Sequence, residues 1–420
     1  MPFDKANAAD ALDANVEMIR EYLTDDDDLL ERYREALESL PKQSMYEIRQ
    51  ALRNTSYPGA LPTKMHDETD SIIHTHFESA SWESHEAVNE WAREVLLDVP
   101  MLAVDGSEIP PTTQFNLPVA YVQAAWCVNH HSSEGRFERG WDDDLLTPSD
   151  LTKESNGGNG RPVDSSLAGL RRYELEGKLV VKRMEELAEA RNAGELTRPP
   201  VVLYDGPLVV AFVTALDEVS RQRYIDTISK IIAASRSLEI PLVGYVAGTD
   251  ATDLTTMIQN FPSSDLDDHP AISDARVLAE LTGRWGDQTT PFVCRRNWSV
   301  DDLSVSGENS QYQFTGEILF SYLNVPPGSG LDRIEFPDWL VNEDGPEEYD
   351  RMYDYVVETV RAEAAIGRGY PELLQQADSD AVLDQRDRDQ FLRLVQNWAE
   401  ENDIPLEWDA KALSKERRRR

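Results

Sequence analysis

Two similar stretches of the chain each place an aspartate at the end of an apolar run. Residues 100–110 read PMLAVDGSEIP, and residues 199–212 read PPVVLYDGPLVVAF. We interpret each as a buried strand that ends in a carboxylate, Asp105 or Asp205, with a tight glycine turn after it. Strands can place two such carboxylates side by side, and the glycines let backbone or substrate approach. The two stretches together favour a divalent metal site; the alternative is that both Asp-Gly pairs are only turns.

The chemistry of such a site follows from its ligands. Carboxylate oxygens select Mg²⁺ or Mn²⁺ over Zn²⁺. Phosphodiester hydrolysis needs an activated water and neutralised phosphate charge, and two oxygen-ligated ions about 4 Å apart supply both. Clustered carboxylates also repel one another, so we expect a bound metal to stabilise the protein.

The elements around these two strands alternate in type. Apolar spacing predicts helices in residues 6–54, 87–97, 166–191, 215–238, 272–284, 346–365 and 386–401. Besides the two Asp-Gly strands, it predicts strands at 117–128, 240–247, 313–324 and 333–336. Residues 129–165 are polar, acidic and rich in Gly, Ser and Asn, so we expect a surface insertion or mobile loop there. This order predicts an α/β fold.

Composition restricts the class of protein. The 420 residues are 40% hydrophobic, enough for one large or two ordinary domains. There are 78 acidic and 41 basic residues, a formal net charge of −37, and only 9 of the basic residues are lysines. An acidic, lysine-poor surface favours a protein that works in very high salt; an ordinary acidic protein, or one that avoids nucleic acid, is the alternative. Two distant cysteines, no signal-like N-terminus and no run of 18 apolar residues predict a soluble, cytoplasmic protein with no membrane span.

Seven motifs in order resemble the NurA nuclease family of archaea and some bacteria. They are LAVDGS at 102–107, RRYELE at 171–176, VVLYDGPL at 201–208, IPLVGYVAGT at 240–249, FSYLNV at 320–325, RIEFP at 333–337 and GYPELLQQAD at 369–378. The resemblance covers roughly residues 95–390. It implies a helical N-terminal extension at 1–95, a nuclease domain at 96–400 with the insertion at about 129–165, and a basic-ended tail at 401–420.

The resemblance also implies a fold and a site. The family has an RNase H-like core, with a mixed central sheet flanked by helices. Its metal-site positions fall on Asp105, Glu176 and Asp205, its tyrosine on Tyr370, and its histidine on Asp378. Asp378 departs from the family pattern; a carboxylate binds a hard divalent ion but is not a neutral base. Glu174 and Glu186 remain alternatives to Glu176.

The resemblance implies an activity and partners as well. It implies a Mn²⁺- or Mg²⁺-dependent deoxyribonuclease, of 5′–3′ exonuclease or endonuclease type, that resects DNA ends in double-strand break repair. The implied partners are DNA, a HerA-like hexameric ATPase and a second copy in a homodimer. The alternative is a non-catalytic subunit that docks on the ATPase and threads DNA. No G-x-x-x-x-G-K-[ST] or G-x-S-x-G motif occurs, so neither a P-loop nor serine hydrolase chemistry is predicted.

Other polar groups admit two interpretations. The first set comprises His66, His74, His76 and His85, which we interpret as solvated surface residues, with zinc binding as the alternative. His130 and His131 are interpreted in the same way, at a strand end. The basic run of Arg171, Arg172, Lys178, Lys182 and Arg183 fits a DNA path or a salt-bridged helix surface. The KERRRR tail at 415–420 is either disordered or a contact for DNA or a partner.

Overall fold

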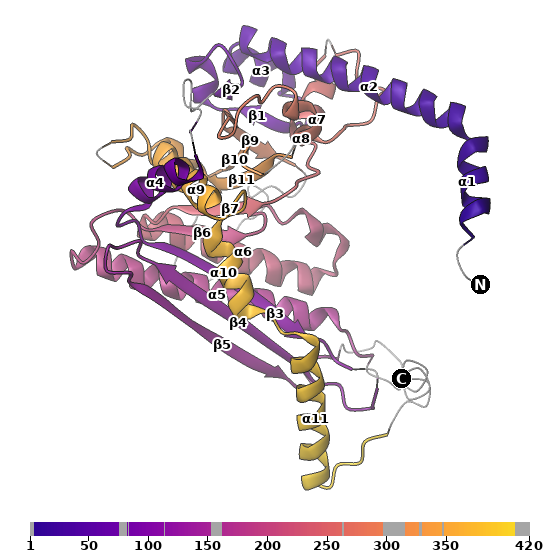
Figure 1. Ribbon diagram of the computed structural model, residues 1–420, viewed down its shortest axis with the longest axis vertical. Coiled ribbons are helices and arrows are strands. Elements are labelled where there is room, and N and C mark those ends of the chain that lie inside the picture. Colours follow the sequence, from indigo (N-terminus) through magenta and orange to yellow (C-terminus); the bar gives the residue numbers. More distant parts are fainter. Residues whose placement is uncertain are drawn as a thin grey trace. The chain divides into compact units, whose positions relative to one another are not determined.

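The structure is a computed structural model (Figure 1). It describes residues 4–74, 82, 84–112, 114–152, 162–262, 264–296, 316–326, 330–346 and 348–407. His76, the KERRRR tail and most of the Gly- and Asn-rich stretch at 155–162 lie outside these residues. The chain divides into two compact units. The first comprises residues 1–80, 247–297 and 320–333, and the second comprises residues 81–246, 298–319 and 334–420.

The second unit is built on a mixed sheet flanked by helices. Its strands run in the order β7-β6-β3-β4-β5. Their bounds are β3 Met101–Ile109, β4 Ala120–Asn129, β5 Phe137–Leu146, β6 Val201–Asp205 and β7 Leu242–Val246. The β7-β6 and β6-β3 pairs are parallel, whereas the β3-β4 and β4-β5 pairs are antiparallel. The predicted mixed α/β architecture is therefore confirmed.

In the described part of the second unit, six helices accompany this sheet. They are α4 His85–Leu96, α5 Ser166–Asn192, α6 Glu218–Leu238, α9 Met352–Ile366, α10 Glu372–Ala381 and α11 Gln385–Glu401, with short 3₁₀ turns η3 Ala211–Ala215 and η5 Asp338–Val341. Helices α5 and α10 both pack on β3 and β4, and α6 packs on α5. Gln123 of β4 donates to the Ala381 carbonyl of α10, whereas the ring of Trp126 lies against the Arg183 guanidinium of α5. Side chains alternate between the two faces along a strand, so Gln123 and Trp126 of β4 point to opposite faces of the sheet. Helices α10 and α5 therefore cover opposite faces.

Two predictions about this sheet are wrong. We expected Gly106 to end the first strand, but β3 continues to Ile109. It continues because β4 pairs with it along its whole length, from Met101–Asn129 to Ile109–Tyr121. We also expected a loop throughout 129–165, but β5 lies within it. In the described sheet, β5 is an edge strand that pairs only with β4, and most of its residues are partly or fully exposed. An exposed strand can be acidic and needs no apolar pattern, and for that reason the sequence did not reveal it.

The first unit combines helices with short strands. Its helical elements are α1 Lys5–Ala14, α2 Val16–Ser39, η1 Leu40–Lys42, α3 Met45–Leu52, η2 Lys64–Glu68, α7 Asp253–Gln259 and α8 Asp274–Ala279. Its strands are β1 Gly59–Pro62, β2 Ile73–His74, β8 Gln288–Thr289 and β9 Phe292–Arg295. Strands β1 and β9 pair antiparallel, as do β2 and β8. Strands β10 Ile318–Leu323 and β11 Asp332–Pro337 contain residues of both units.

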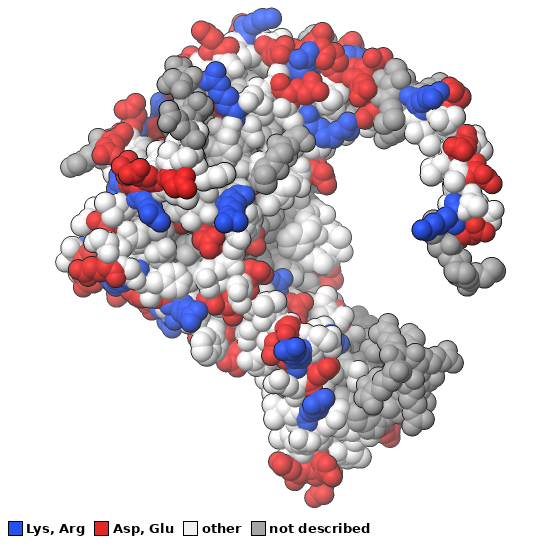
Figure 2. All heavy atoms as spheres, in the orientation of Figure 1, with Lys and Arg blue, Asp and Glu red and all other residues white. Residues whose placement is uncertain are grey.

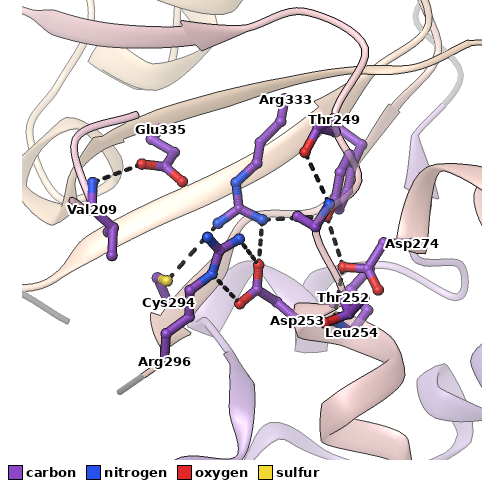
Figure 3. A network of polar contacts seen from close by, with 12 residues as sticks. Val209, Thr249, Thr252, Asp253, Leu254, Asp274, Cys294, Arg296, Arg333 and Glu335 are labelled. Atoms are coloured by element: carbon purple, nitrogen blue, oxygen red, sulfur yellow. Dashed lines mark hydrogen bonds and ion pairs between the residues drawn. The ribbon is translucent and has the colours of Figure 1, made fainter. Parts of the chain in front are cut away.

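An ionic network lies in the core of the first unit (Figure 3). The Asp253 carboxylate is 3% exposed and lies between the guanidinium groups of Arg296 and Arg333, with an Arg333 Nη1–Oδ2 distance of 2.6 Å. Nearby, Asp274 accepts hydrogen bonds from the Leu254 and Thr255 amides and from a buried tyrosine hydroxyl. Each buried carboxylate therefore has charged or hydrogen-bonding partners that offset its desolvation.

Three observations bear on the predictions from composition. Acidic side chains are scattered over the face shown in Figure 2 rather than gathered in one patch. Cys127 and Cys294 are both buried free thiols. Among the described residues, no helix combines the length and the apolar character that a membrane crossing requires.

Candidate active site

Asp105 and Asp205 occupy equivalent positions on neighbouring parallel strands. The β3-β6 register pairs Val104 with Tyr204, and each aspartate is the next residue along its strand. Strand β6 ends at Asp205, whereas β3 continues along β4. The two carboxylates therefore lie where the two strands part, at the carboxyl end of their parallel-paired segment, which is the usual location of sites in parallel sheets.

Tyr370 and Asp378 approach these aspartates from the C-terminal part of the chain. The Tyr370 hydroxyl donates to Asp205 Oδ1 at 3.1 Å. Its ring packs edge-on against Tyr245, the β7 residue that pairs with Asp205, with centroids 5.4 Å apart. Asp378 lies two turns into α10, where its charge acts on both Asp105 and Asp205. The structure thus brings four of the sequence-predicted residues together.

Glu176 reaches β3 from the other face of the sheet. It projects from α5 and is 6% exposed. A Cβ atom built on Gly106 would overlap its carboxylate, so the glycine leaves the space that Glu176 occupies. Because Gly106 follows Asp105, the two residues face opposite sides of the strand. Glu176 therefore lies against the backbone beside Asp105, separate from the Asp378 side.

Arg172 holds Glu176 in place. Its Nη1 donates to Glu176 Oε1 at 2.8 Å and to the Gly106 carbonyl at 3.2 Å, and its Nε lies 2.6 Å from Glu108 Oε2. The single guanidinium therefore ties α5 to β3 through the Glu108 carboxylate and the Gly106 carbonyl, and it also pairs with Glu176 of its own helix. Such charge-assisted contacts are stronger and more directional than neutral ones.

The two alternative glutamates have other partners. Glu174 accepts from Arg223 Nε and Nη2, both at 2.7 Å, and Glu186 pairs with Arg183. Of the three glutamates, Glu176 is the one that the structure places against β3. Arg171, Arg172 and Arg183 of the basic run also pair with acidic side chains, which fits the salt-bridged interpretation of that helix better than the DNA path.

The carboxylates have raised pKa values. Burial, together with the Asp205 and Asp378 charges, raises the pKa of Asp105 to about 6, although Arg172 opposes the change. Burial also raises the pKa of Glu176 to about 7, against the opposing effect of Arg172. The pKa of Asp205 is raised by burial and by Asp378. A nearby cation would stabilise the ionised forms of these acids and so lower their pKa values.

The donor chemistry fits a hard divalent cation. Asp105, Asp205 and Asp378 offer only oxygen donors, the ligands that Mg²⁺ and Mn²⁺ prefer. Within the described part of the chain, however, no three metal-binding side chains lie close enough together to hold one ion. The carboxylates would therefore have to draw together around a metal.

The places of two residues, Glu335 and His131, were not recognised from the sequence. Glu335 of β11 is fully buried, and its Oε2 accepts from the Leu208 and Val209 amides in the segment after Asp205 (the Val209 contact is drawn in Figure 3). Its only sequence signal is its place in the RIEFP motif. His131, expected on a solvated surface, is largely buried against Glu363.

The other histidines do not form a zinc site in the described residues. His66 is buried, against expectation, and its Nε2 lies 2.9 Å from the Gln43 carbonyl. His74 and His85 are exposed, on β2 and at the start of α4. His130 is also buried, against expectation, and its Nε2 lies 3.1 Å from Glu138 Oε1.

The fold and the site together define a class. It is a mixed α/β protein with acidic residues directly after the parallel-paired segment of two adjacent strands. The model of the NurA domain matches residues 99–383, more than half of the chain, so this protein belongs to the NurA family. Family membership indicates a nuclease.

Among solved structures, the chain is similar to the NurA nuclease from Sulfolobus solfataricus, with 14% identity and a TM-score of 0.43. That match covers 72% of this chain and 85% of the other. No curated protein matches the sequence.

Proposed function

We propose that this protein is a divalent-metal-dependent DNA nuclease that acts in the resection of DNA ends. The observation that carries the proposal is the side-by-side placement of Asp105 and Asp205, with Tyr370 hydrogen-bonded to Asp205. An RNase H-like arrangement of the sheet and the use of Mn²⁺ or Mg²⁺ are parts of the same proposal. They rest on the family resemblance and on the all-oxygen donor set.

Each site residue has a proposed part. Asp105, Asp205 and Asp378 bind the metal, and Glu176 supports it from the α5 side while held by Arg172. The bound metal would neutralise phosphate charge and lower the pKa of a water nucleophile. Tyr370 orients Asp205 through its hydroxyl, which can also reach a phosphate oxygen.

The partner proposal follows from charge. A chain with a net charge of −37 repels free DNA at low salt. Productive contact with DNA would therefore depend on a partner that feeds the strand in. The family resemblance suggests which partner, and we propose a HerA-like hexameric ATPase acting on a homodimer. Co-purification at native salt tests this: recovery of a HerA-like protein is expected, and repeated failure to recover one contradicts the proposal.

The nuclease itself is tested with plasmid-nicking and linear-duplex resection assays, with Mn²⁺ in high KCl. The Asp105→Asn and Asp205→Asn variants should each abolish cleavage while the protein stays folded. The exposed Asp389 of α11 provides the control, because Asp389→Asn also removes one carboxylate but lies outside the site. If either site variant cleaves as the parent does, the metal-site assignment is wrong.

A second candidate function is a non-catalytic NurA-like subunit that docks on the ATPase and threads DNA. The observation that favours it is the lack of three converging metal ligands among the described residues. The same assays separate the two. A parent protein that never cleaves, with or without the ATPase, supports the docking subunit.

A further inference from the structure

Two hydrogen-bond acceptors enclose the ring of His131. His131 lies just after β4, with its backbone in the left-handed region (φ 46°). Its Nδ1 is 2.7 Å from the Val99 carbonyl oxygen and its Nε2 is 3.0 Å from Glu363 Oε1. A neutral imidazole has one N–H and can donate to only one of them. The arrangement therefore needs one extra proton, held on the ring or on the carboxyl group.

The other oxygen of Glu363 caps a helix. Glu363 is 2% exposed on α9, and its Oε2 accepts from the Leu373 amide at 2.9 Å. Leu373 is the second residue of α10, whose N-cap residue, Pro371, makes no side-chain hydrogen bond. The first turn of a helix has amides without intrahelical partners, and a carboxylate there is favourable. Glu363 thus supplies to α10 the cap that its own sequence lacks.

Helix α10 and the segment before it carry two of the site residues. Tyr370 lies two residues before α10, and Asp378 lies within it. We propose that His131 and Glu363 form a positioning pair that shares one proton, fixes the start of α10 and thereby places Tyr370 and Asp378. The structural part of this proposal stands alone, whereas its effect on cleavage rests on the proposed nuclease function.

The shared proton makes the link pH-dependent. When the proton leaves, the ring keeps one N–H for two acceptors, so a nitrogen lone pair faces either the Glu363 carboxylate or the Val99 carbonyl oxygen. The repulsion displaces the ring and weakens the hold of Glu363 on Leu373. The link is therefore present at lower pH and lost as the pH rises. We expect alkaline conditions to loosen the start of α10 and to lower cleavage.

The other titratable groups near the pair do not supply this proton. Burial raises the pKa of the Cys127 thiol, which faces Glu363, to about 12. His130 is paired with Glu138, and burial lowers its pKa. The charge of Asp380, on α10, acts on the Cys127 thiol and helps to raise its pKa. Asp98 is exposed, and it contacts His131 through its backbone amide, which donates to the His131 carbonyl.

One substitution tests the shared proton separately from the anchor, by which we mean the contact of residue 363 with the Leu373 amide. In Glu363→Gln, the amide oxygen can accept from Leu373, and the amide NH₂ can donate to a neutral His131 ring. The link then needs no extra proton. In Glu363→Leu, neither contact can form. The neighbouring His130–Glu138 pair gives the matched control, because Glu138→Gln changes a similar contact that does not touch α10.

Hydrogen–deuterium exchange of peptides covering residues 367–381 gives a readout independent of cleavage. After correction for intrinsic exchange, the parent and Glu138→Gln should lose protection as the pH rises, whereas Glu363→Gln should keep it. Glu363→Leu should be poorly protected at every pH. In cleavage assays with Mn²⁺, Glu363→Leu should lose about tenfold to a hundredfold in kcat, and the alkaline fall in the parent should be absent from Glu363→Gln.

The outcomes distinguish the two proposals. Identical exchange profiles for the parent and Glu363→Gln would overturn the shared proton, and full protection in Glu363→Leu would overturn the anchor. A parent that exchanges as expected but never cleaves would contradict the nuclease function and leave the positioning pair supported.

Discussion

Gly106→Ala should disturb the site without changing a polar group. The new Cβ would overlap the Glu176 carboxylate and lie 2.9 Å from Arg172 Cγ and 3.0 Å from Glu176 Cδ. Arg172 can shift its flexible chain, but Glu176 is enclosed and must move away from its ion pair. Overpacking of this kind costs about 1–3 kcal/mol. Loss of a partly buried ion pair adds to that, so we expect about 2–4 kcal/mol of lost stability.

A double-mutant cycle isolates the cause. Urea unfolding in constant high KCl gives the free energy of unfolding for Gly106→Ala, Glu176→Ala and the double variant. Once Glu176 is truncated, the space for the new methyl group exists, so Gly106→Ala should then cost less than about 1 kcal/mol. Gly169→Ala is the matched control, because its Cβ would meet only the Glu108 carboxylate, with Oε1 at 3.5 Å and Oε2 at 4.0 Å. That helix substitution should be neutral or stabilise by about 0.5–1 kcal/mol.

The refuting result is additivity. If Gly106→Ala costs the same in both backgrounds within about 0.5 kcal/mol, Glu176 does not occupy the space beside Gly106. Cleavage measured on the same variants adds a functional test. A displaced Glu176 that leaves cleavage unchanged would remove it from the proposed site.

Four further predictions concern protonation, metal binding and the Tyr370 hydrogen bond. Without metal, the free energy of unfolding should fall as the pH rises from about 4 to about 7. The reason is that Glu176 and Asp105, with pKa values of about 7 and about 6 in the folded protein, hold protons that the unfolded chain releases near pH 4. Mn²⁺ should flatten this fall, and a melting temperature independent of pH and Mn²⁺ would contradict the prediction. Asp378→Ala should reduce the Mn²⁺-induced rise in melting temperature, and an unchanged rise would place Asp378 outside the site. Asp378→His should restore the family pattern and keep or raise cleavage, so a loss of cleavage would contradict that prediction. Tyr370→Phe removes the hydrogen bond to Asp205 and should lower kcat more than it changes the melting temperature, which steady-state kinetics and thermal unfolding together can check.

The parts of the fold that position the site were predictable because they are buried on regular elements. Long apolar runs identified β3, β4, β6 and β7, and helical spacing identified α5 and α9. The start of α10 also follows Pro371, as a proline at the beginning of a helix suggests. The family resemblance then led to residues that the structure brings together, namely Asp105, Asp205, Tyr370 and Asp378.

What could not be predicted depends on contacts between distant parts of the chain. His131 and Glu363 are 232 residues apart, and neither lies in a recognisable pattern. Glu335 contacts a loop 127 residues earlier. Such pairs are set by packing, and a single sequence carries no signal for them. Strand β5 was missed for a different reason, since an edge strand with little burial needs no apolar pattern.

The two Asp-Gly pairs show how one short pattern serves two structural purposes. Gly206 follows the end of β6 with φ +123°, a backbone conformation that side chains rarely adopt, so the turn interpretation holds there. Gly106 lies inside β3, where the turn interpretation fails. There the missing side chain makes room for Glu176, while the preceding Asp105 faces the opposite side. If Asp105 and Glu176 both act on one metal, they must approach it from opposite faces of β3. They can do so only beside Gly106, the one residue of β3 without a side chain, and for that reason a glycine is required immediately after Asp105.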